Sequence, residues 1–410
     1  MKTYLVGGAI RDKLLNIAVK DKDWVVVGST AEELLSLGYV QVGKGFPVFL
    51  HPETKQEYAL ARTETKTAPG HTGFQINSSP EVTLEEDLRR RDLTINAIAE
   101  DKNGELIDPY GGRDDIESKT LRHVSEAFSE DPLRVIRVAR FAARFSHLGF
   151  SIADATMDLM KAISKSGQLD TLSAERIWQE LELALGTSSP SVFIALLREC
   201  GALNAILPEV NNLFGVPQQE SYYLEIDTGL HALMCLEKIS KLTEDKTIRY
   251  ATLIHSVGKA ITEKSNWPIH HGYESLGLRL QANITTRLRP PKEYSSLAAL
   301  VCEHHTKVLR IKELNANTIL SLLESLDAIR RPERLEKFLI ACEADALGRN
   351  DVEEKNYQPC EYLKFVLEFV CSLEIEKLLK ENPNQDPKNL IKSNRLKLIA
   401  EAIEDISRNK

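Results

Sequence analysis

The sequence predicts an α+β protein in which an N-terminal part containing strands is followed by a helical remainder. Short apolar runs at residues 3–6 and 25–27 flank a glycine pair and an acidic segment, as expected for strands joined by functional turns. Beyond about residue 146 the apolar residues recur at helical spacing, and glycine and proline separate the segments. A chain of 410 residues is long enough for two to four domains.

Composition excludes several classes of protein. Hydrophobic residues make up 42% and charged residues 27% of the chain, which is typical of a globular protein. No apolar run approaches the roughly 20 residues of a membrane span, and the N-terminus lacks a signal-peptide pattern, so we expect a cytoplasmic location without membrane contact. The six cysteines contain no Cys-x-x-Cys pair, which argues against a zinc ribbon. With a net charge of -8, any RNA site must be a local basic patch.

A glycine pair follows the first predicted strand. Gly7 and Gly8 carry no Cβ atom, so the backbone can approach a triphosphate closely. Arg11 then lies near the start of a short helix predicted at residues 10–15, where backbone N–H groups and a guanidinium can face an anion. A glycine pair taken alone is more often an ordinary turn.

An acidic pair begins the next predicted strand. Because successive strand side chains point to opposite faces, Asp21 and Asp23 should project together and Lys22 away from them. Two carboxylates on one face suit Mg2+, which takes oxygen ligands and keeps room for substrate phosphates. A solvated strand end is the alternative, but the glycine turn just upstream favours a metal-dependent nucleotidyl transfer site.

The rest of the N-terminal part adds a helix at residues 29–38 and strands at 48–50 and 58–62. Glu57, just before the last of these strands, is a candidate third carboxylate that could accept a proton from an attacking hydroxyl. A solvated edge glutamate is an equal alternative. Residues 63–79 are rich in Gly, Pro, Ser and Thr and are predicted to form a loop beside the site.

Two arginine-rich segments follow. In residues 88–99 three arginines precede Asp92 and an apolar run of helical character, a pattern that is usually a solvated face. In residues 130–141 Pro132 after two acids indicates a helix start. Five side chains in and after this segment are spaced three, three, three and four residues apart and so form one stripe of the helix: Asp131, Arg134, Arg137, Arg140 and Arg144. We expect the four arginines to be too costly to bury. The stripe could therefore be a salt-bridged surface or a binding face.

In combination, the glycine turn, the acidic pair, Arg-Arg-Asp at residues 90–92 and Glu-Asp-x-x-Arg at residues 130–134 resemble the nucleotidyltransferase superfamily that includes DNA polymerase beta. Within it, the chain is most similar to the bacterial class II CCA-adding enzymes of enterobacterial type, over nearly its whole length. The resemblance implies a nucleotidyltransferase head with a mixed β-sheet and helices (residues 1–125), followed by an all-helical neck (126–200), body (201–340) and tail (341–410), with the tRNA acceptor stem lying along them.

The resemblance also implies the activity and its residues. The expected reaction is template-independent addition and repair of the 3′-terminal CCA of tRNA from CTP and ATP, with Mg2+ as cofactor and pyrophosphate as product, by a monomer. The catalytic carboxylates would be Asp21, Asp23 and Glu57, the first two as metal ligands. Asp131 and Arg134 would read the base edge, Asp92 would fix the ribose or the backbone, and the nucleotide-binding set as a whole would be Gly8, Arg11, Arg91, Asp131, Arg134, Arg137 and Arg140.

Six of the ten histidines lie between residues 227 and 305, which suggests a metal site. The spacing of His231, His255, His271 and His305 resembles a histidine/aspartate phosphohydrolase domain appended to some CCA-adding enzymes. An adjacent His-Asp pair anchors the metal there, whereas this chain has His255-Ser256. A hydroxyl supplies no charge to offset a cation. We therefore predict a degenerate domain whose metal site is empty or inert and whose phosphohydrolase activity is lost.

Two other functions fit parts of the pattern. A poly(A) polymerase shares the glycine turn, the carboxylates and the arginine helix, but it should end in a strongly basic tail, and this chain ends with mixed charge. A non-catalytic tRNA-binding protein, or a phosphohydrolase with a decayed head, is the alternative from another class. The intact acidic pair and arginine stripe argue against a decayed head.

Overall fold

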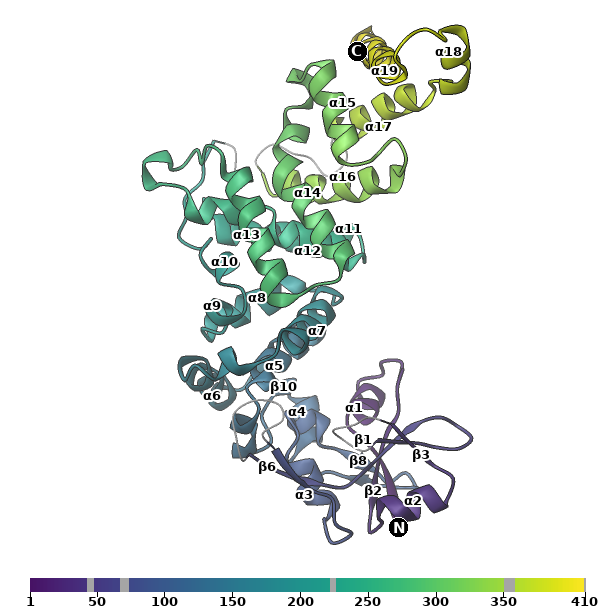
Figure 1. Cartoon of the computed structure of the whole chain (residues 1–410). Coiled ribbons are helices and arrows are strands. Elements are labelled where there is room, and N and C mark those ends of the chain that lie inside the picture. The colour runs from purple at the N-terminus through teal and green to yellow at the C-terminus, as the bar shows by residue number, and fades with distance from the viewer. Residues whose placement is uncertain (43–47, 67–73, 222–225, 350–357, 409–410) are drawn as a thin grey trace. The chain divides into compact units, whose positions relative to one another are not determined.

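A computed structural model describes residues 1–42, 48–66, 74–221, 226–349 and 358–408 of the chain. They form two compact units, Met1–Ile206 and Leu207–Lys410, the first coloured from purple to teal and the second from teal to yellow in Figure 1. The predicted α+β class is confirmed, since the first unit contains a mixed sheet with helices and the chain beyond it is mostly helical. The finer division into head, neck, body and tail stays a prediction.

The first unit is built on a seven-stranded sheet with the strand order β3-β4-β5-β2-β1-β8-β9. Neighbouring strands are antiparallel except β2 and β5, which run parallel. The strands are Lys2–Val6 (β1), Asp23–Val27 (β2), Val40–Val42 (β3), Val48–Leu50 (β4), Glu57–Leu60 (β5), Ala99–Glu100 (β8) and Leu106–Ile107 (β9).

Side-chain alternation along β2 divides the core between the two faces of this sheet. Val25 packs on one face with Leu88 of helix α3 (Leu84–Arg89). Val26 packs on the other face with Leu34 of helix α2 (Ala31–Ser36). Both helices begin with a threonine capping box, which satisfies their first backbone N–H groups. Asp23 lies two residues before Val25, so its side chain belongs to the face that α3 covers.

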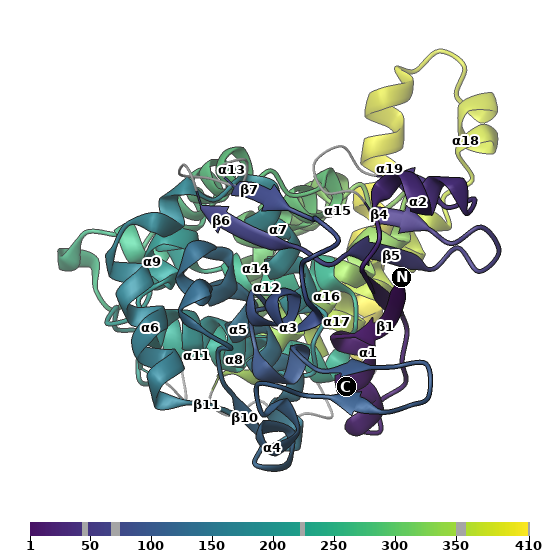
Figure 2. The same cartoon turned by 90° about the horizontal axis from the view of Figure 1, so that it is seen from below.

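The prediction that residues 63–79 form a loop is wrong for both ends of this segment. These ends are the strands Thr63–Lys66 (β6) and Phe74–Asn77 (β7), which pair antiparallel and lie side by side in Figure 2. Residues 67–73 lie outside the described residues. The glycines and prolines that suggested a loop are confined to the middle of the segment, so its average composition hid the threonines and apolar residues that favour strands at its ends.

Helix α5 (Leu133–Phe145) organises the helical half of the first unit. Its residues Val135, Ile136 and Val138 are fully buried, and it packs against α7 and α8. A short parallel strand pair, Thr120–Leu121 (β10) and Ser151–Ile152 (β11), lies beside it. The other helices of the unit are α1 (Gly8–Leu14), α4 (Gly112–Glu117), α6 (Asp154–Lys165), α7 (Ala174–Leu185), α8 (Pro190–Glu199) and α9 (Leu203–Ile206).

The second unit is helical throughout its described elements. A Cβ atom on Gly258 would stand 1.9 Å from the carbonyl oxygen of Tyr273, so only glycine lets this segment approach α13 so closely. The helices are α10 (Pro208–Asn211), α11 (Thr228–Leu242), α12 (Lys246–Ile254), α13 (Tyr273–Leu288), α14 (Lys292–Leu309), α15 (Ala316–Ser325), α16 (Pro332–Leu347), α17 (Gln358–Cys371), α18 (Ile375–Glu381) and α19 (Pro387–Arg408). Among the described helices, none is both long and apolar enough to cross a membrane.

Candidate functional site

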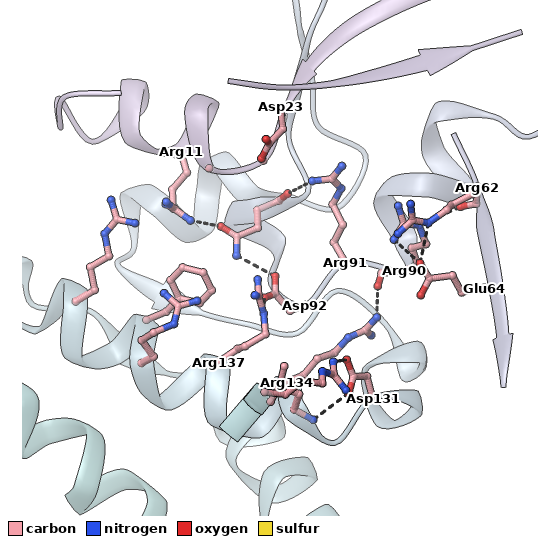
Figure 3. A pocket seen from close by; sticks show the side chains of 18 residues that line it. Arg11, Asp23, Arg62, Glu64, Arg90, Arg91, Asp92, Asp131, Arg134 and Arg137 are labelled. Carbon is pink, nitrogen blue, oxygen red and sulfur yellow. Dashed lines mark hydrogen bonds and ion pairs between the residues drawn. The ribbon is translucent and has the colours of Figure 1, made fainter. Parts of the chain in front are cut away.

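A cavity of about 540 Å³ in the first unit is lined mainly by charged side chains (Figure 3). Arginines outnumber acidic residues by nine to four in its lining, so it should attract a polyanion. The lining brings together the glycine turn, the start of β2, the segment after α3, and α5. It consists of Gly7, Gly8, Arg11, Asp23, Arg62, Glu64, Arg90, Arg91, Asp92, Asn96, Asp131, Leu133, Arg134, Arg137, Arg140, Phe141, Arg144 and Arg176.

The glycine turn forms one wall of this cavity. Gly7 has a φ of 68°, in the left-handed region that favours glycine, and a Cβ atom there would come within 2.8 Å of the Arg91 guanidinium. Helix α1 begins at the next residue and carries Arg11, which is buried against Phe141 and Phe145 of α5. The turn, through Gly7 and Gly8, and the helix, through Arg11, therefore line the same cavity.

Of the three predicted carboxylates, Asp23 lines the cavity, whereas neither Asp21 nor Glu57 is among the described residues of the lining. The expected strand start at Asp21 is wrong, because β2 begins at Asp23 and Asp21 lies in the irregular segment before it. Partial desolvation and the nearby charge of Asp21 raise the pKa of the Asp23 carboxyl, although Arg91 opposes the shift. Glu57 begins β5 in register with Asp23, and residues in register on adjacent strands share a face.

A buried carboxylate holds the arginines at the end of α3. Asp87 accepts hydrogen bonds from Arg90 at 2.6 Å and from Arg91 at 3.2 Å. Burial alone would raise the pKa of Asp87, but the two guanidinium charges and these hydrogen bonds lower it. Arg90 also donates to Glu64 of β6 at 2.9 Å. Arg91 is thereby fixed at the cavity wall, where the sequence predicted a triphosphate contact.

Asp92 joins the segment after α3 to α5. Its carboxylate accepts hydrogen bonds from the Asn96 amide at 2.9 Å, from the Leu93 backbone at 2.8 Å and from Arg137 at 2.7 Å. Burial opposes ionisation, but the charge of Arg137 and the hydrogen bonds outweigh it and hold the pKa of Asp92 well below its usual value. The same ion pair raises the pKa of Arg137. Asp92 thus contacts the backbone of the next residue, and its expected role in fixing a ribose or the backbone stays a prediction.

The two residues predicted to read the base occupy one rim of the cavity. Asp131 accepts two hydrogen bonds from Arg176 of α7, at 3.2 and 2.7 Å. Arg134 donates to the carbonyl oxygens of Ala127 and Arg90, and it lines the cavity with 8% of its surface exposed. Both side chains are therefore held in place before any ligand arrives.

The expectation that the arginine stripe would be too costly to bury is wrong for part of it. Arg134 and Arg140 are only 8% and 9% exposed. Burial is possible because each guanidinium has acceptors: Arg140 donates to Glu180 at 2.5 Å and lies 4.2 Å from the ring centroid of Phe141. Arg137 also lies 3.5 Å from Glu180, and Arg144 donates to Asp12 of α1.

The side chains that organise the cavity and that sequence reasoning missed include Asn96, Arg176 and Glu180, besides Asp87 and Glu64. Asn96 accepts a hydrogen bond from Arg11 and donates to Asp92. Arg176 and Glu180 stand four residues apart on α7, so they lie on the same side of that helix, where Arg176 lines the cavity and Glu180 contacts Arg140. The four-residue spacing of these two side chains can be read from the sequence. No local pattern shows that their partners lie forty or more residues earlier in the chain.

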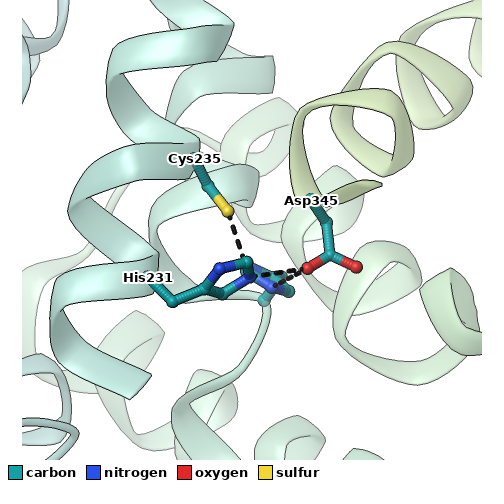
Figure 4. Close-up of side chains that lie close together, drawn as sticks. His231, Cys235 and Asp345 are labelled. Carbon is teal, nitrogen blue, oxygen red and sulfur yellow. Dashed lines mark hydrogen bonds and ion pairs between the residues drawn. The ribbon is translucent and has the colours of Figure 1, made fainter. Parts of the chain in front are cut away.

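In the second unit the structure brings together three of the four histidines of the predicted degenerate domain. The rings of His231, His255 and His305 lie close to one another in the core, whereas His271 is exposed and lines a different cavity. The prediction that His271 belongs to the set is therefore wrong. Asp345 of α16 contacts both His231 and His255 (Figure 4), so the cluster has a carboxylate that the sequence reasoning missed.

The sequence of this chain is similar to those of known proteins. Residues 3–122 match the model of the poly A polymerase head domain, and residues 149–214 match that of the probable RNA and SrmB-binding site of polymerase A. The chain is 53% identical over 401 residues to the multifunctional CCA protein of Shewanella denitrificans, covering 98% of this chain and 97% of that protein.

Solved structures share the fold. A CCA-adding enzyme in complex with CTP superimposes with a TM-score of 0.65 at 18% identity, over 100% of this chain and 91% of that one. The Thermotoga maritima CCA-adding enzyme complexed with tRNA-CCA gives a TM-score of 0.62 at 19% identity, with coverages of 100% and 91%. At these identities the likeness is one of fold.

Proposed function

Since the chain belongs to the family of multifunctional CCA proteins, we infer that it adds and repairs the 3′-terminal CCA of tRNA without a template. CTP and ATP are the substrates and pyrophosphate is released. The observation that carries this inference is the arginine-lined cavity beside Asp23, which offers positive charge to a triphosphate next to carboxylates that can hold a cation. A tRNA-binding protein without catalysis would not need both.

The carboxylates fit a divalent cation, which we propose to be Mg2+. Burial is the main cause of the raised pKa of Asp23, and the charge of Asp21 adds to it. A cation bound by the two carboxylates would favour their ionised forms. Two Mg2+ ions held by Asp21 and Asp23 would supply charge neutralisation of the triphosphate and activation of the tRNA 3′-hydroxyl. Glu57, in register with Asp23, would accept the proton of that hydroxyl.

The nucleotide would be held by side chains that are already ordered. Gly8, Arg11, Arg91, Arg137 and Arg140 would contact the triphosphate, since all five line the cavity. Asp131 and Arg134 would offer acceptors and donors to the Watson–Crick edge of C or A. Such a site rejects a wrong base because buried polar groups are then left unpaired.

Two further proposals concern the state of the protein. A cytoplasmic location is supported by the cysteines, all six of which are free thiols, as expected in a reducing compartment. We also propose, as the sequence led us to expect, that the protein acts as a monomer.

The function is tested with tRNA that lacks its 3′-terminal CCA. Incubation with CTP alone should add two C residues, and CTP with ATP should add C, C and A and then stop, which sequencing of the products measures. A long run of A residues would instead identify a poly(A) polymerase. Binding of the tRNA without any extension would identify a protein that has lost catalysis.

Replacement of Asp21 by alanine tests the metal-binding carboxylates. We expect Asp21→Ala to slow addition of both CMP and AMP by at least roughly 10²–10³-fold, the loss typical when one group that stabilises developing charge is removed. Binding of tRNA, measured by filter retention, should change little. Lys22→Ala is the matched control, since Lys22 is the exposed neighbour of both acids. Activity of Asp21→Ala near that of the control would remove this acid from the mechanism.

Replacement of Arg134 by alanine tests base selection. Arg134→Ala should relax discrimination against UTP and GTP by roughly 1 to 3 kcal/mol, because one polar partner of the correct base is lost. Arg137→Ala, one helical turn away, should slow all nucleotides alike, since phosphates are common to them. Single-nucleotide incorporation rates give both values. If misincorporation by Arg134→Ala stays at the wild-type level while every rate falls, Arg134 only supports the fold.

The second unit should have lost phosphohydrolase activity, because Ser256 stands where a metal-binding carboxylate would be required. The Ser256 hydroxyl is buried, and it has no hydrogen-bond partner among the described residues. We expect negligible turnover of 2′,3′-cyclic AMP or pyrophosphate with Mg2+, Mn2+ or Ni2+, measured by phosphate or nucleotide release. Robust metal-dependent turnover that His255→Ala abolishes would show this proposal to be wrong.

A further inference from the structure

Arg176 of α7 holds the carboxylate of Asp131 at the rim of the arginine-lined cavity, where Figure 3 shows Asp131 beside Arg134. The Nη1 and Nη2 atoms of Arg176 lie 3.2 Å from Oδ1 and 2.7 Å from Oδ2 of Asp131, so the guanidinium contacts both carboxylate oxygens. The two side chains are 19% and 21% exposed. Arg176 therefore stands beside the substrate space without belonging to the arginine stripe of α5.

Helix α7 is anchored, and this fixes the position of Arg176. The Ser173 hydroxyl accepts a hydrogen bond from the Arg176 backbone N–H at 3.5 Å and caps the start of the helix. One turn later, Glu180 accepts a hydrogen bond from Arg140 of α5 at 2.5 Å. Asp131 lies just before α5, so two helices that are tied to each other carry the two partners of the ion pair.

The hydrogen bonds of Asp131 leave one acceptor position on its carboxylate. An ionised carboxylate offers about four acceptor positions, two on each oxygen. Oδ1 accepts from the Leu133 backbone N–H at 3.1 Å and from Arg176, which occupies both of its positions. Oδ2 accepts from Arg176, and no second donor reaches it from the part of the chain that the structure describes. One position on Oδ2 is therefore left for a ligand in the cavity.

A single fixed acceptor distinguishes the bases by their exocyclic groups. C and A carry an amino group there, which donates a hydrogen bond. U and G carry a carbonyl oxygen at the equivalent place, which can only accept and would meet Oδ2 with no proton between them. Two buried acceptors in contact lose their bonds to water and gain none, so U and G are disfavoured in this pose.

We propose that Arg176 is a positioning residue that determines base selection by fixing the Asp131 carboxylate. This rests on the proposed function, in which Asp131 reads the base edge. With Arg176 in place, the plane of the carboxylate is held at both oxygens. Without it, the single hydrogen bond from the Leu133 backbone remains, so the carboxylate can turn away from the carbonyl group of U or G and tolerate it. Selection then weakens, while the guanidinium groups of α5 still face the phosphates.

The change Arg176→Ala tests this role in single-nucleotide addition to tRNA that lacks its 3′ end. We expect the ratio of kcat/KM for CTP over UTP, and for ATP over GTP at the last position, to fall by at least roughly fivefold, because a wrong base no longer leaves a polar group unpaired. Arg176→Lys should lose a similar part of the ratio, since an ammonium group cannot hold two oxygens as a planar fork does. It also keeps the proposal testable if the alanine variant does not fold. Gln179→Ala is the matched control, because Gln179 is an exposed polar residue of the same helix.

A double-mutant cycle separates positioning from structural support. If Arg176 acts through Asp131, the ratio should already be low in Asp131→Ala, and adding Arg176→Ala should change it by no more than roughly twofold. The proposal is overturned if Arg176→Ala keeps the wild-type ratio, if Arg176→Lys restores that ratio, or if the losses of the two alanine variants multiply. Failure of the wild type to add C or A would instead refute the proposed function. Addition by the wild type together with unchanged selection by Arg176→Ala would refute the positioning role alone.

Discussion

The ion pair between Asp92 and Arg137 is the contact on which the geometry of the arginine-lined cavity depends. The Asp92 carboxylate is buried and ionised, so the loss of Arg137 would leave an uncompensated charge in the core. Through Asn96 the same carboxylate is connected to Arg11, and thereby to the helix that follows the glycine turn. One buried charge therefore relates three segments that are far apart in the sequence.

The cavity concentrates positive charge, and ion pairs with carboxylates hold the guanidinium groups in place. Asp87 fixes Arg90 and Arg91 on one side, and Glu180 approaches Arg137 and Arg140 on the other. Each carboxylate lowers the repulsion among neighbouring guanidinium groups and orients them before a ligand arrives. Rigid groups of this kind lose little conformational freedom on binding, which favours selection of the nucleotide by geometry.

Much of the fold and part of the site could be predicted from sequence. The strand-then-helix order, the glycine turn and the arginine stripe depend on local patterns, and the structure contains them. Glu180 and Asp345 could not be found in this way, because each contacts partners at least forty residues distant in the chain. Asp21 was misplaced by a rule of alternation that holds only inside a strand, and β2 begins two residues later.

Asp12 forms ion pairs with two arginines that line the cavity, and these pairs bear on the binding of substrate and the release of product. It binds Arg11 with one oxygen and Arg144 with the other, while Glu180 and Asp131 engage further arginines of the cavity. A triphosphate that binds as proposed would compete with these carboxylates for the same guanidinium groups. In that case the carboxylates already paired with the arginines would limit how tightly a polyphosphate is retained. Such competition would help a reaction that expels pyrophosphate after every addition, because the carboxylates would pair with the arginines again as the product leaves.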